Sequence, residues 1–195
     1  FGTYNPIHVG HLIIANYMAD YTALDEVWLI VSPQNPLKQK SSLLADYHRY
    51  AMVEIAVQDN PKLKPSNIEF KLPQTSYTIN TLTYLKEKHP KHEFSLIMGE
   101  DNLRTLNKWK NYEEIIQNHK IYVYPRALIE QEQIDTQSTN KVGKTNSTNI
   151  VICDAPVMRV SASFIRNAIK QKKDVRYLLT EPVHKYVQEM NFYKK

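Results

Sequence analysis

The segment with the clearest capacity for chemistry lies at the head of the chain, where two glycines and two histidines occur within ten residues. It reads Gly2-Thr3-Tyr4-Asn5-Pro6-Ile7-His8-Val9-Gly10-His11. Glycine lets backbone approach a ligand closely, and the helix expected to open at His11 offers unpaired N–H groups and a favourable dipole to an anion. His8 and His11 can share one face of the first turn and donate hydrogen bonds to phosphoryl oxygens. The pattern predicts a phosphate-binding loop.

Two other interpretations of the histidine pair stay open at this stage. The imidazoles could ligate a metal, or they could cap the helix without any ligand. A zinc site needs further ligands, and the chain has a single cysteine, Cys153, so the candidates are few. Cys153 ends an apolar run and is interpreted as a buried strand thiol rather than a nucleophile. We therefore predict no metal site built from protein ligands.

A second helix start near the far end of the chain has similar properties. It reads Val160-Ser161-Ala162-Ser163-Phe164-Ile165-Arg166. Ser161 is a good N-cap, and the free N–H groups after it can hold a phosphate. Arg166 lies about one and a half turns later, where its guanidinium can bind phosphate oxygens bidentately. The alternative is a plain capped amphipathic helix with a surface arginine. The phosphate interpretation expects both helix starts to converge on one triphosphate.

The elements that must position these residues alternate along the chain. Apolar, β-rich runs predict strands over 26–32, 93–99, 120–124 and 149–153. Helical spacing predicts helices over 11–21, 46–59, 78–88, 161–172 and 182–190. Asp46 and Thr78 are interpreted as N-capping residues, and Pro182 suits a first helical turn. Near-continuous apolar strands alternating with helices indicate an α/β fold around a parallel sheet.

The length of 195 residues fits one domain over 1–195, and 42% hydrophobic with 23% charged residues is ordinary globular usage. Residues 127–148 are polar and are expected to form a surface insertion. The chain opens inside what reads as a strand-to-helix loop, so we expect a first, apolar strand before residue 1.

The net charge of +5 is compatible with nucleic acid or with small polyanions such as nucleotide phosphates. The charge is spread along the chain without a block of like residues, so we interpret it as a mildly basic, solvated surface and expect no nucleic-acid partner. No run of about 18 apolar residues and no signal peptide is seen, which predicts a cytoplasmic protein with no membrane partner. A homo-oligomer is compatible with the sequence, which does not set the oligomeric state.

Both helix-start segments resemble motifs of the nucleotidylyltransferase superfamily. The first is similar to Gly-(Ser/Thr)-Phe-(Asp/Asn)-Pro-(Ile/Val)-His-x-Gly-His and departs at Tyr4. The second is similar to Ile-Ser-Ser-Thr-x-Ile-Arg and departs at Ala162 and Ser163. The resemblance implies a Rossmann-like doubly wound parallel sheet with helices on both faces and a small C-terminal helical part. It also implies an ATP site formed by Gly2, Thr3, Tyr4, Gly10, Gly99, Asp101, Ser161 and Arg166.

The middle of the chain resembles the nicotinate mononucleotide adenylyltransferases of that superfamily. Three stretches carry the resemblance: Pro33-Gln34-Asn35-Pro36-Leu37-Lys38, Ser76-Tyr77-Thr78-Ile79-Asn80-Thr81-Leu82, and Gly99-Glu100-Asp101 with Trp109 eight residues later. The first departs at Leu37, where histidine is frequent. The resemblance implies that Asp101 accepts from ribose hydroxyls and that the pyridine mononucleotide is bound by Ser76, Tyr77, Thr78 and Trp109. The alternatives are that Lys38 is a solvated loop lysine, that the stretch 76–82 is only a capped helix start, and that Trp109 belongs to the core.

The implied reaction joins ATP and nicotinate mononucleotide to the dinucleotide in NAD biosynthesis and releases pyrophosphate. The catalytic residues would be His8, His11, Lys38 and Arg166. Mg²⁺ would arrive with ATP, held by phosphate oxygens and water. One alternative is another transferase of the superfamily, such as a phosphopantetheine adenylyltransferase or a cytidylyltransferase. The other is a non-catalytic nucleotide sensor or RNA-binding module. The choice between nicotinate and nicotinamide stays open, although a carboxylate bound at Thr78 favours the acid.

Overall fold

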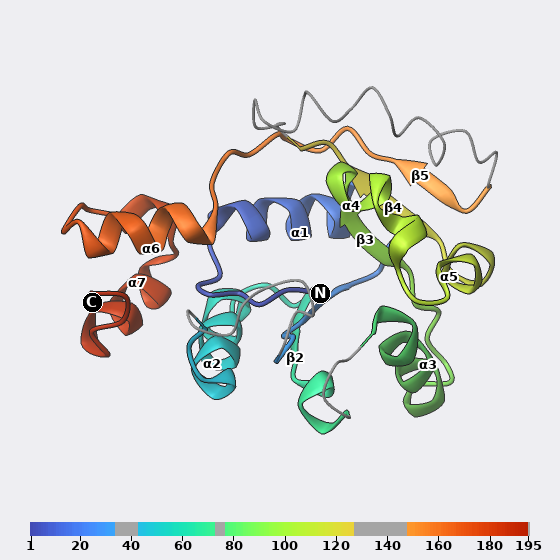
Figure 1. Ribbon diagram of the computed structural model, residues 1–195, viewed down its shortest axis with the longest axis horizontal. Coiled ribbons are helices and arrows are strands. Elements are labelled where there is room, and N and C mark those ends of the chain that lie inside the picture. Colours follow the sequence, from blue (N-terminus) through green and yellow to red (C-terminus); the bar gives the residue numbers. More distant parts are fainter. Residues whose placement is uncertain (34–42, 73–76, 127–147, 195) are drawn as a thin grey trace. The chain divides into compact units, whose positions relative to one another are not determined.

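The computed structural model describes residues 1–33, 43–72, 77–126 and 148–194 (Figure 1). Contacts within the chain define two compact units, which are described separately. Unit 1 comprises Phe1–Ser76 with Val160–Lys195, and unit 2 comprises Tyr77–Arg159. The single domain expected over 1–195 stays a prediction.

Two parallel strands form the sheet of unit 1, β1 (Val27–Ile30) and β2 (Leu63–Ser66). The head of the chain joins β1 through an isolated parallel bridge between Gly2 and Val31. The N–H of Gly2 donates to the Ile30 carbonyl at 3.0 Å, and the N–H of Ser32 donates to the Gly2 carbonyl at 2.8 Å. The glycine-histidine segment therefore starts from a fixed point beside the end of β1.

Unit 1 contains four α-helices in its described part: α1 (Val9–Tyr21), α2 (Asp46–Val57), α6 (Ala162–Lys170) and α7 (Glu181–Glu189). Two 3₁₀ turns, η2 (Ile68–Lys71) and η6 (Arg176–Leu178), accompany them. Helix α1 packs on both strands and on η6, while α2 packs on β2 and α7. Apolar side chains of the helices thus pack on the buried strands, as the apolar runs predict.

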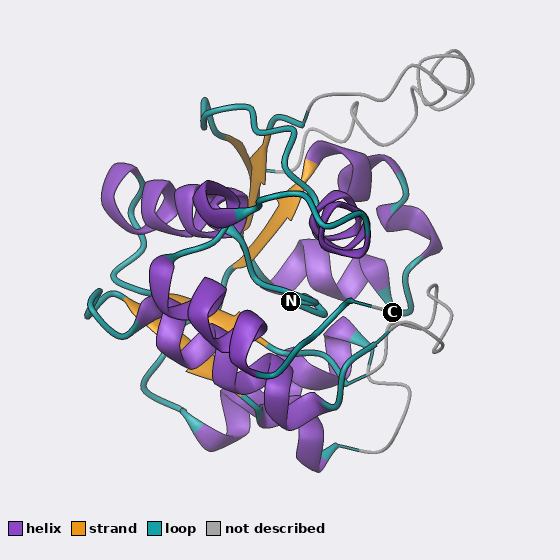
Figure 2. Cartoon of the chain, turned by 90° about the vertical axis from the view of Figure 1, so that its left-hand side faces the viewer, coloured by secondary structure: helices purple, strands orange, loops and turns teal. Residues whose placement is uncertain are grey.

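Unit 2 is built on three parallel strands in the order β3 (Leu96–Gly99), β4 (Ile121–Tyr124) and β5 (Ile150–Ile152). Helices α3 (Thr78–Lys88), α4 (Glu100–Arg104) and α5 (Tyr112–Asn118), with the 3₁₀ turn η3 (Leu106–Lys108), accompany them. Its core contains Ile79, Leu82, Leu96, Met98, Leu103, Leu106, Ile115, Ile121 and Val123. Helices surround the strands of each unit (Figure 2), which confirms the α/β fold with parallel strands.

The four predicted strands are present as β1, β3, β4 and β5, and the five predicted helices as α1, α2, α3, α6 and α7. Strand β2 was not predicted, because Lys64 and Pro65 interrupt its pattern and proline is unfavourable within a strand. Asp46 and Thr78 are not N-caps: Ala45 and Tyr77 hold those positions, and both expected caps lie in the first turn instead. Among the described helices, none combines the length and apolarity needed to cross a membrane.

Candidate active site

The two histidines lie together at the N-terminus of the 13-residue helix α1, where His8 is the N-cap. The His8 ring is buried, with 6% of the residue exposed. It stacks on the His11 ring, with centroids 3.8 Å apart and an interplanar angle of 27°. The N–H of His8 donates to Nδ1 of His11 at 3.2 Å. The pair is therefore held where the helix dipole favours an anion.

This hydrogen bond also sets the tautomer of His11. Nδ1 accepts a hydrogen bond from the His8 amide, so in the neutral imidazole the proton of His11 resides on Nε2. An Nε2–H is the donor that a phosphoryl oxygen requires. The Tyr4 ring contacts the His11 ring edge-on at a centroid distance of 5.1 Å and limits its rotation. The loop thus positions His11 as a hydrogen-bond donor.

Close packing explains the glycine between the two histidines. A Cβ at Gly10 would lie 3.1 Å from both Cε1 and Nδ1 of His8. It would also lie 3.7 Å from Cβ of Val160, two residues before α6. A larger residue at position 10 would therefore displace the His8 ring. The same contact brings the segment that leads into α6 against the start of α1.

Helix α6 begins as the sequence predicts. Ser161 is its N-cap, and its Oγ accepts a hydrogen bond from the N–H of Phe164 at 3.2 Å. Nη1 of Arg166 donates to the Asn5 carbonyl at 2.8 Å, and Nη2 donates to Oγ of Ser163 at 3.1 Å. Ser163, which departs from the superfamily motif, therefore orients the guanidinium. Arg166 lies against the same loop that carries His8, as the converging arrangement requires.

Gly2, Thr3 and Tyr4, the other predicted residues of the loop, fix the path of its main chain. A Cβ at Gly2 would lie 3.1 Å from Cζ of Tyr4. Tyr4 is buried and has a φ of 45°. This left-handed conformation is costly for a bulky residue. The carbonyl of Thr3 accepts a hydrogen bond from Nη1 of Arg49 at 2.7 Å. The ring of Tyr4 thus fills the space over Gly2 while its backbone turns toward Asn5.

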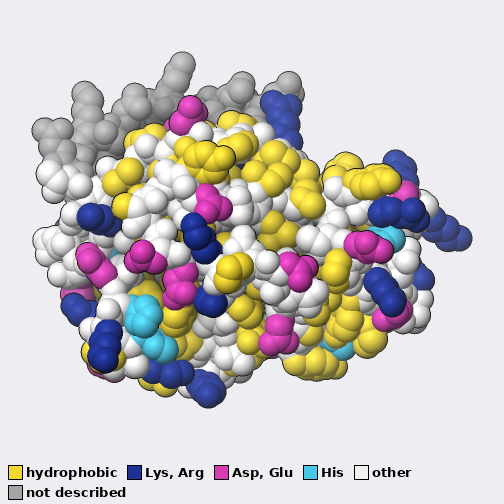
Figure 3. All heavy atoms as spheres, turned by 180° about the vertical axis from the view of Figure 1, so that it is seen from behind, with side chains coloured by type: hydrophobic (Ala, Val, Ile, Leu, Met, Phe, Trp, Pro, Cys, Tyr) yellow, Lys and Arg dark blue, Asp and Glu magenta, His cyan; other side chains and the backbone are white. Residues whose placement is uncertain are grey.

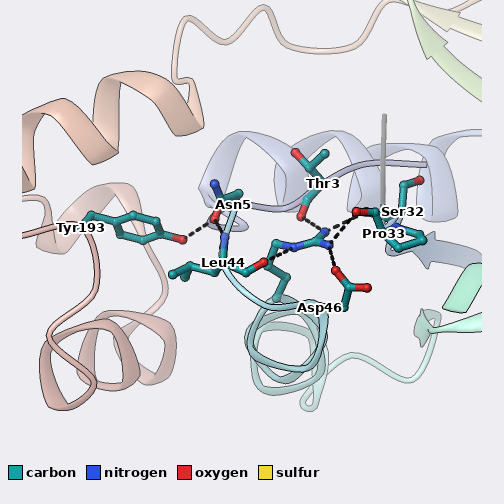
Figure 4. A network of polar contacts seen from close by, with 8 residues as sticks. Thr3, Asn5, Ser32, Pro33, Leu44, Asp46 and Tyr193 are labelled. Atoms are coloured by element: carbon teal, nitrogen blue, oxygen red, sulfur yellow. Dashed lines mark hydrogen bonds and ion pairs between the residues drawn. The ribbon is translucent and has the colours of Figure 1, made fainter. Parts of the chain in front are cut away.

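No sequence motif indicated Arg49, which organises this region through hydrogen bonds to the residues around it (Figure 4). The residue is 0% exposed. Its guanidinium donates to four main-chain carbonyls and to one carboxylate; the acceptors are Thr3, Ser32, Pro33, Leu44 and the Asp46 side chain. A signal was present in the sequence, because Arg49 shares the i, i+4, i+8 spacing of Val53 and Val57 on the buried face of α2.

In unit 2, the predicted Gly99 ends β3 and Asp101 lies in the first turn of α4. Oδ2 of Asp101 accepts from Nη1 of Arg126 at 2.6 Å. Oδ1 is buried and has no hydrogen-bond partner in the described part of the chain. A Cβ at Gly99 would lie 2.5 Å from this oxygen, so a side chain there would displace the Asp101 carboxylate. Arg126, for which no strong role was predicted, therefore holds one oxygen of the carboxylate.

Three of the residues expected at the pyridine ring, Tyr77, Thr78 and Trp109, also belong to unit 2. Trp109 is half-buried and packs against the core of that unit, so part of its ring is structural. Tyr77 is the N-cap of α3 and 38% exposed, and Nζ of Lys110 lies 4.7 Å from its ring centroid. Thr78 is half-buried in the first turn of α3. Lys38 and Ser76 lie outside the described residues.

The described residues hold no group of three or more His, Cys, Asp or Glu side chains that could ligate a metal ion. Cys153 is buried, as expected for a structural thiol, and its burial raises the pKa of the thiol. The arrangement in unit 1 is instead one of hydrogen-bond donors and positive partial charges, which suits a polyanion.

Comparison with known proteins gives a consistent result. The model of the cytidylyltransferase-like family matches residues 1–168. A relative from Flavobacterium johnsoniae, named a probable nicotinate-nucleotide adenylyltransferase, is 56% identical over 100% of this chain and 97% of its own length. Relatives of the same name from Christiangramia forsetii (53% identical, 100% and 96% covered) and Bacteroides fragilis (39%, 95% and 88%) also match.

Solved structures agree on the fold. The nicotinic acid mononucleotide adenylyltransferase of Plasmodium falciparum, solved with NaAD, superposes with a TM-score of 0.75 at 16% identity, covering 99% of this chain and 94% of that one. A putative nicotinate-nucleotide adenylyltransferase from Vibrio parahaemolyticus gives 0.70 at 19% identity, with 100% and 92% covered.

The chain therefore belongs to the cytidylyltransferase-like family and, within it, to the group of the nicotinate-nucleotide adenylyltransferases. It is an enzyme of the nucleotidyltransferase class, with the Rossmann-like architecture that the sequence resemblance implied.

Proposed function

We propose that this chain transfers the adenylyl group of ATP to nicotinate mononucleotide and releases pyrophosphate, a step of NAD biosynthesis. One observation carries the proposal: the stacked pair of His8 and His11 at the start of α1 lies in the same loop whose Asn5 carbonyl binds Arg166. The names of the full-length relatives support nicotinate mononucleotide as the acceptor.

The chemistry needs no covalent enzyme intermediate. A phosphate oxygen of the acceptor attacks the α-phosphorus of ATP in line, a new P–O bond forms, and the bond to the β-phosphate oxygen breaks to release pyrophosphate. Negative charge on the phosphoryl oxygens must be stabilised during this step. Nε2–H of His11 donates to the α-phosphate, while His8, Lys38, Arg166 and the N–H groups after Ser161 hold the remaining phosphate oxygens. Gly2, Thr3, Tyr4 and Gly10 shape the loop beneath them.

Other residues are proposed to recognise the sugar and the ring. Asp101, next to Gly99, accepts hydrogen bonds from ribose hydroxyls through its carboxylate. Trp109 stacks on the pyridine ring with its exposed part. Tyr77 and Thr78 lie at the start of α3, where backbone N–H groups can bind the nicotinate carboxylate, and Ser76 is proposed to bind the mononucleotide with them.

Mg²⁺ enters as the complex with ATP, where it neutralises phosphate charge. The start of α1 offers hydrogen-bond donors for the phosphate oxygens of such a complex. Small molecules in the cytoplasm, rather than nucleic acid, are the proposed partners. On the face shown in Figure 3, Lys and Arg side chains are interspersed with Asp and Glu and form no continuous basic stripe.

The test is an acceptor panel with the purified chain, Mg²⁺ and ATP, in which pyrophosphate release is followed. The acceptors are nicotinate mononucleotide, nicotinamide mononucleotide and phosphopantetheine, with CTP as an alternative donor. We expect the highest kcat/KM with ATP and nicotinate mononucleotide. A higher value for phosphopantetheine or CTP would assign the chain to another activity, and RNA binding without ATP turnover would favour the non-catalytic alternative.

A further inference from the structure

Asn5 is a junction between three distant segments of unit 1, and it is only 2% exposed. Its Oδ1 accepts a hydrogen bond from the hydroxyl of Tyr193 at 2.8 Å and from the N–H of Leu44 at 3.3 Å. Its carbonyl accepts from Nη1 of Arg166 at 2.8 Å. Figure 4 shows the Tyr193 ring pointing directly at the Asn5 side chain. A residue near the C-terminal end of the sequence thus contacts the loop of the two histidines.

The end of α7 explains how Tyr193 reaches the loop. Asn191 adopts a left-handed conformation, with a φ of 54°. Its N–H donates to the Gln188 carbonyl, and the N–H of Phe192 donates to the Val187 carbonyl, both at 3.1 Å. These are the two hydrogen bonds of a Schellman motif, which ends a helix and reverses the chain. The helix end therefore sets the direction of the residues that follow.

Phe192 then anchors the segment. Its ring packs edge-on against His48 of α2 with a centroid distance of 4.7 Å, and against Tyr186 of α7 at 5.9 Å. Tyr193 has a φ of 62°, a conformation that a tyrosine adopts only where surrounding contacts compensate for its cost. The hydrogen bond to Asn5 is one such contact. The conformation indicates that the Tyr193 hydroxyl is held in position beside Asn5.

Burial raises the pKa of Tyr193 well above the ordinary tyrosine value, with smaller opposing effects from Arg166 and Arg49. The hydroxyl therefore remains protonated at neutral pH and acts as the donor to Asn5, whose Oδ1 can only accept. This direction of the hydrogen bond leaves the amide group of Asn5 in one fixed orientation.

We propose that Tyr193 is a positioning residue for ATP. Tyr193 acts through Asn5 on the guanidinium of Arg166. Tyr193 and Leu44 fix the Asn5 side chain, the fixed residue presents its carbonyl to Arg166, and Arg166 is held in turn toward the start of α1. The inference rests on the proposed function, since it gives Arg166 the phosphates of ATP. It assigns a role to a residue outside both phosphate-binding motifs.

The decisive variant is Tyr193→Phe, which removes only the hydroxyl. Its matched control is Tyr186→Phe, because the Tyr186 hydroxyl also makes a 2.8 Å hydrogen bond, to Nδ1 of His48, but joins α7 to α2. For Tyr193→Phe we expect kcat/KM for ATP to fall about tenfold, as for a misplaced binding group, while KM for the acceptor stays within about twofold. The control is expected to change neither value by more than about twofold.

The same substitution is repeated in an Arg166→Lys background. If Tyr193 acts through Arg166, its effect there shrinks to less than about twofold, because interacting residues are non-additive. An equal effect in both backgrounds, an unchanged kcat/KM for ATP, or the same loss in Tyr186→Phe would overturn the proposal.

A second measurement separates this inference from the proposed function. Calorimetric titration with Mg–ATP alone gives a Kd that does not depend on turnover or on the acceptor. A wild-type chain that binds ATP but uses no acceptor contradicts the proposed function, and the increase in Kd for Tyr193→Phe still tests the positioning role. Equal Kd values for Tyr193→Phe and the wild type would contradict that role even in an active enzyme.

Discussion

His8 and His11 form one unit rather than two separate ligands, because their rings stack 3.8 Å apart and the main chain of His8 binds Nδ1 of His11. The backbone of the first histidine thereby determines which nitrogen of the second carries the proton. A loop of only a few residues can in this way present a donor of defined position and tautomer to a phosphoryl group.

Removal of the His11 imidazole should abolish most of the turnover without unfolding the chain. We expect His11→Ala to lower kcat by about 10²–10³-fold, the usual loss for one donor to a developing charge. The melting temperature should change little, because the ring lies at the start of a helix rather than within the core. Steady-state kinetics and thermal unfolding measure the two effects. The exposed His92 of unit 2 provides the control, and a near-normal rate for His11→Ala would exclude its role.

Gly10 should tolerate no side chain. A Cβ there would lie 3.1 Å from the His8 ring, which is buried and stacked on the His11 ring and so has little room to move. Gly10→Ala should therefore destabilise the chain by about 1–3 kcal/mol, as overpacking usually does, and lower kcat as well. Urea unfolding and the initial rate are the measurements. An alanine variant with full activity would show that the His8 ring need not stay where it lies.

Loss of Arg49 should be among the most damaging single changes. Arg49→Met would leave the main-chain carbonyls around the fully buried position 49 without their donor, and the Asp46 carboxylate, whose side chain is 45% exposed, without its partner. We expect a loss of about 3–5 kcal/mol in the free energy of unfolding, because each buried carbonyl left without a donor costs about 1–3 kcal/mol. Arg176→Met is the control, because Arg176 is exposed on η6, and it should lie within about 0.5 kcal/mol of the wild type. Similar unfolding curves for both variants would refute a structural role for Arg49.

Gly99 and Asp101 can be tested together in unit 2. A Cβ at position 99 would collide with Oδ1 of Asp101, so Gly99→Ala should displace the carboxylate proposed to bind ribose. We expect KM for ATP to rise about tenfold, as for loss of a charge-assisted hydrogen bond. Arg126→Gln breaks only a partly exposed ion pair and should cost less than about 1 kcal/mol in stability. Unchanged ATP kinetics in Gly99→Ala would mean that Asp101 does not contact the nucleotide.

The raised pKa of Tyr193 predicts a loss of stability at alkaline pH. The folded state keeps its proton above the ordinary value of 10.0 while the unfolded state releases it, so stability is complete below pH 10 and falls as the pH rises beyond it. Each unit of pH in that range should cost up to about 1.4 kcal/mol for this one group. Urea unfolding between about pH 10 and 12 should therefore show a shallower decline for Tyr193→Phe than for the wild type. Parallel declines would contradict the effect of burial on this phenol.

Local signals in the sequence predicted most of the structure around the loop. The helix after the histidine loop (predicted from His11 and found from Val9), the Ser161 cap and four of the strands all follow from residues that lie next to each other in the chain. Strand β2 could not be predicted in this way, because Pro65 breaks its pattern and its partner β1 stabilises it through the sheet.

Long-range contacts were beyond the sequence patterns. The residues next to Tyr193 in the sequence do not indicate a partner 188 positions away. Whether its hydroxyl reaches Asn5 depends on how α7 ends. Arg49 carried a weak signal, a charged residue on an apolar helix face, but its acceptors are carbonyls that no side-chain pattern reveals. The roles of Lys38 and Ser76, outside the described residues, stay predictions.

The acceptors of Arg49 have a consequence for how this region can change during evolution. Four of the five groups that it binds are main-chain oxygens, which every amino acid possesses. Positions 3, 32, 33 and 44 can therefore exchange one side chain for another and still satisfy the guanidinium, provided the backbone path is kept. The backbone beneath the loop therefore depends on the side chain of Arg49 alone, and substitutions at the residues that it binds leave these hydrogen bonds intact.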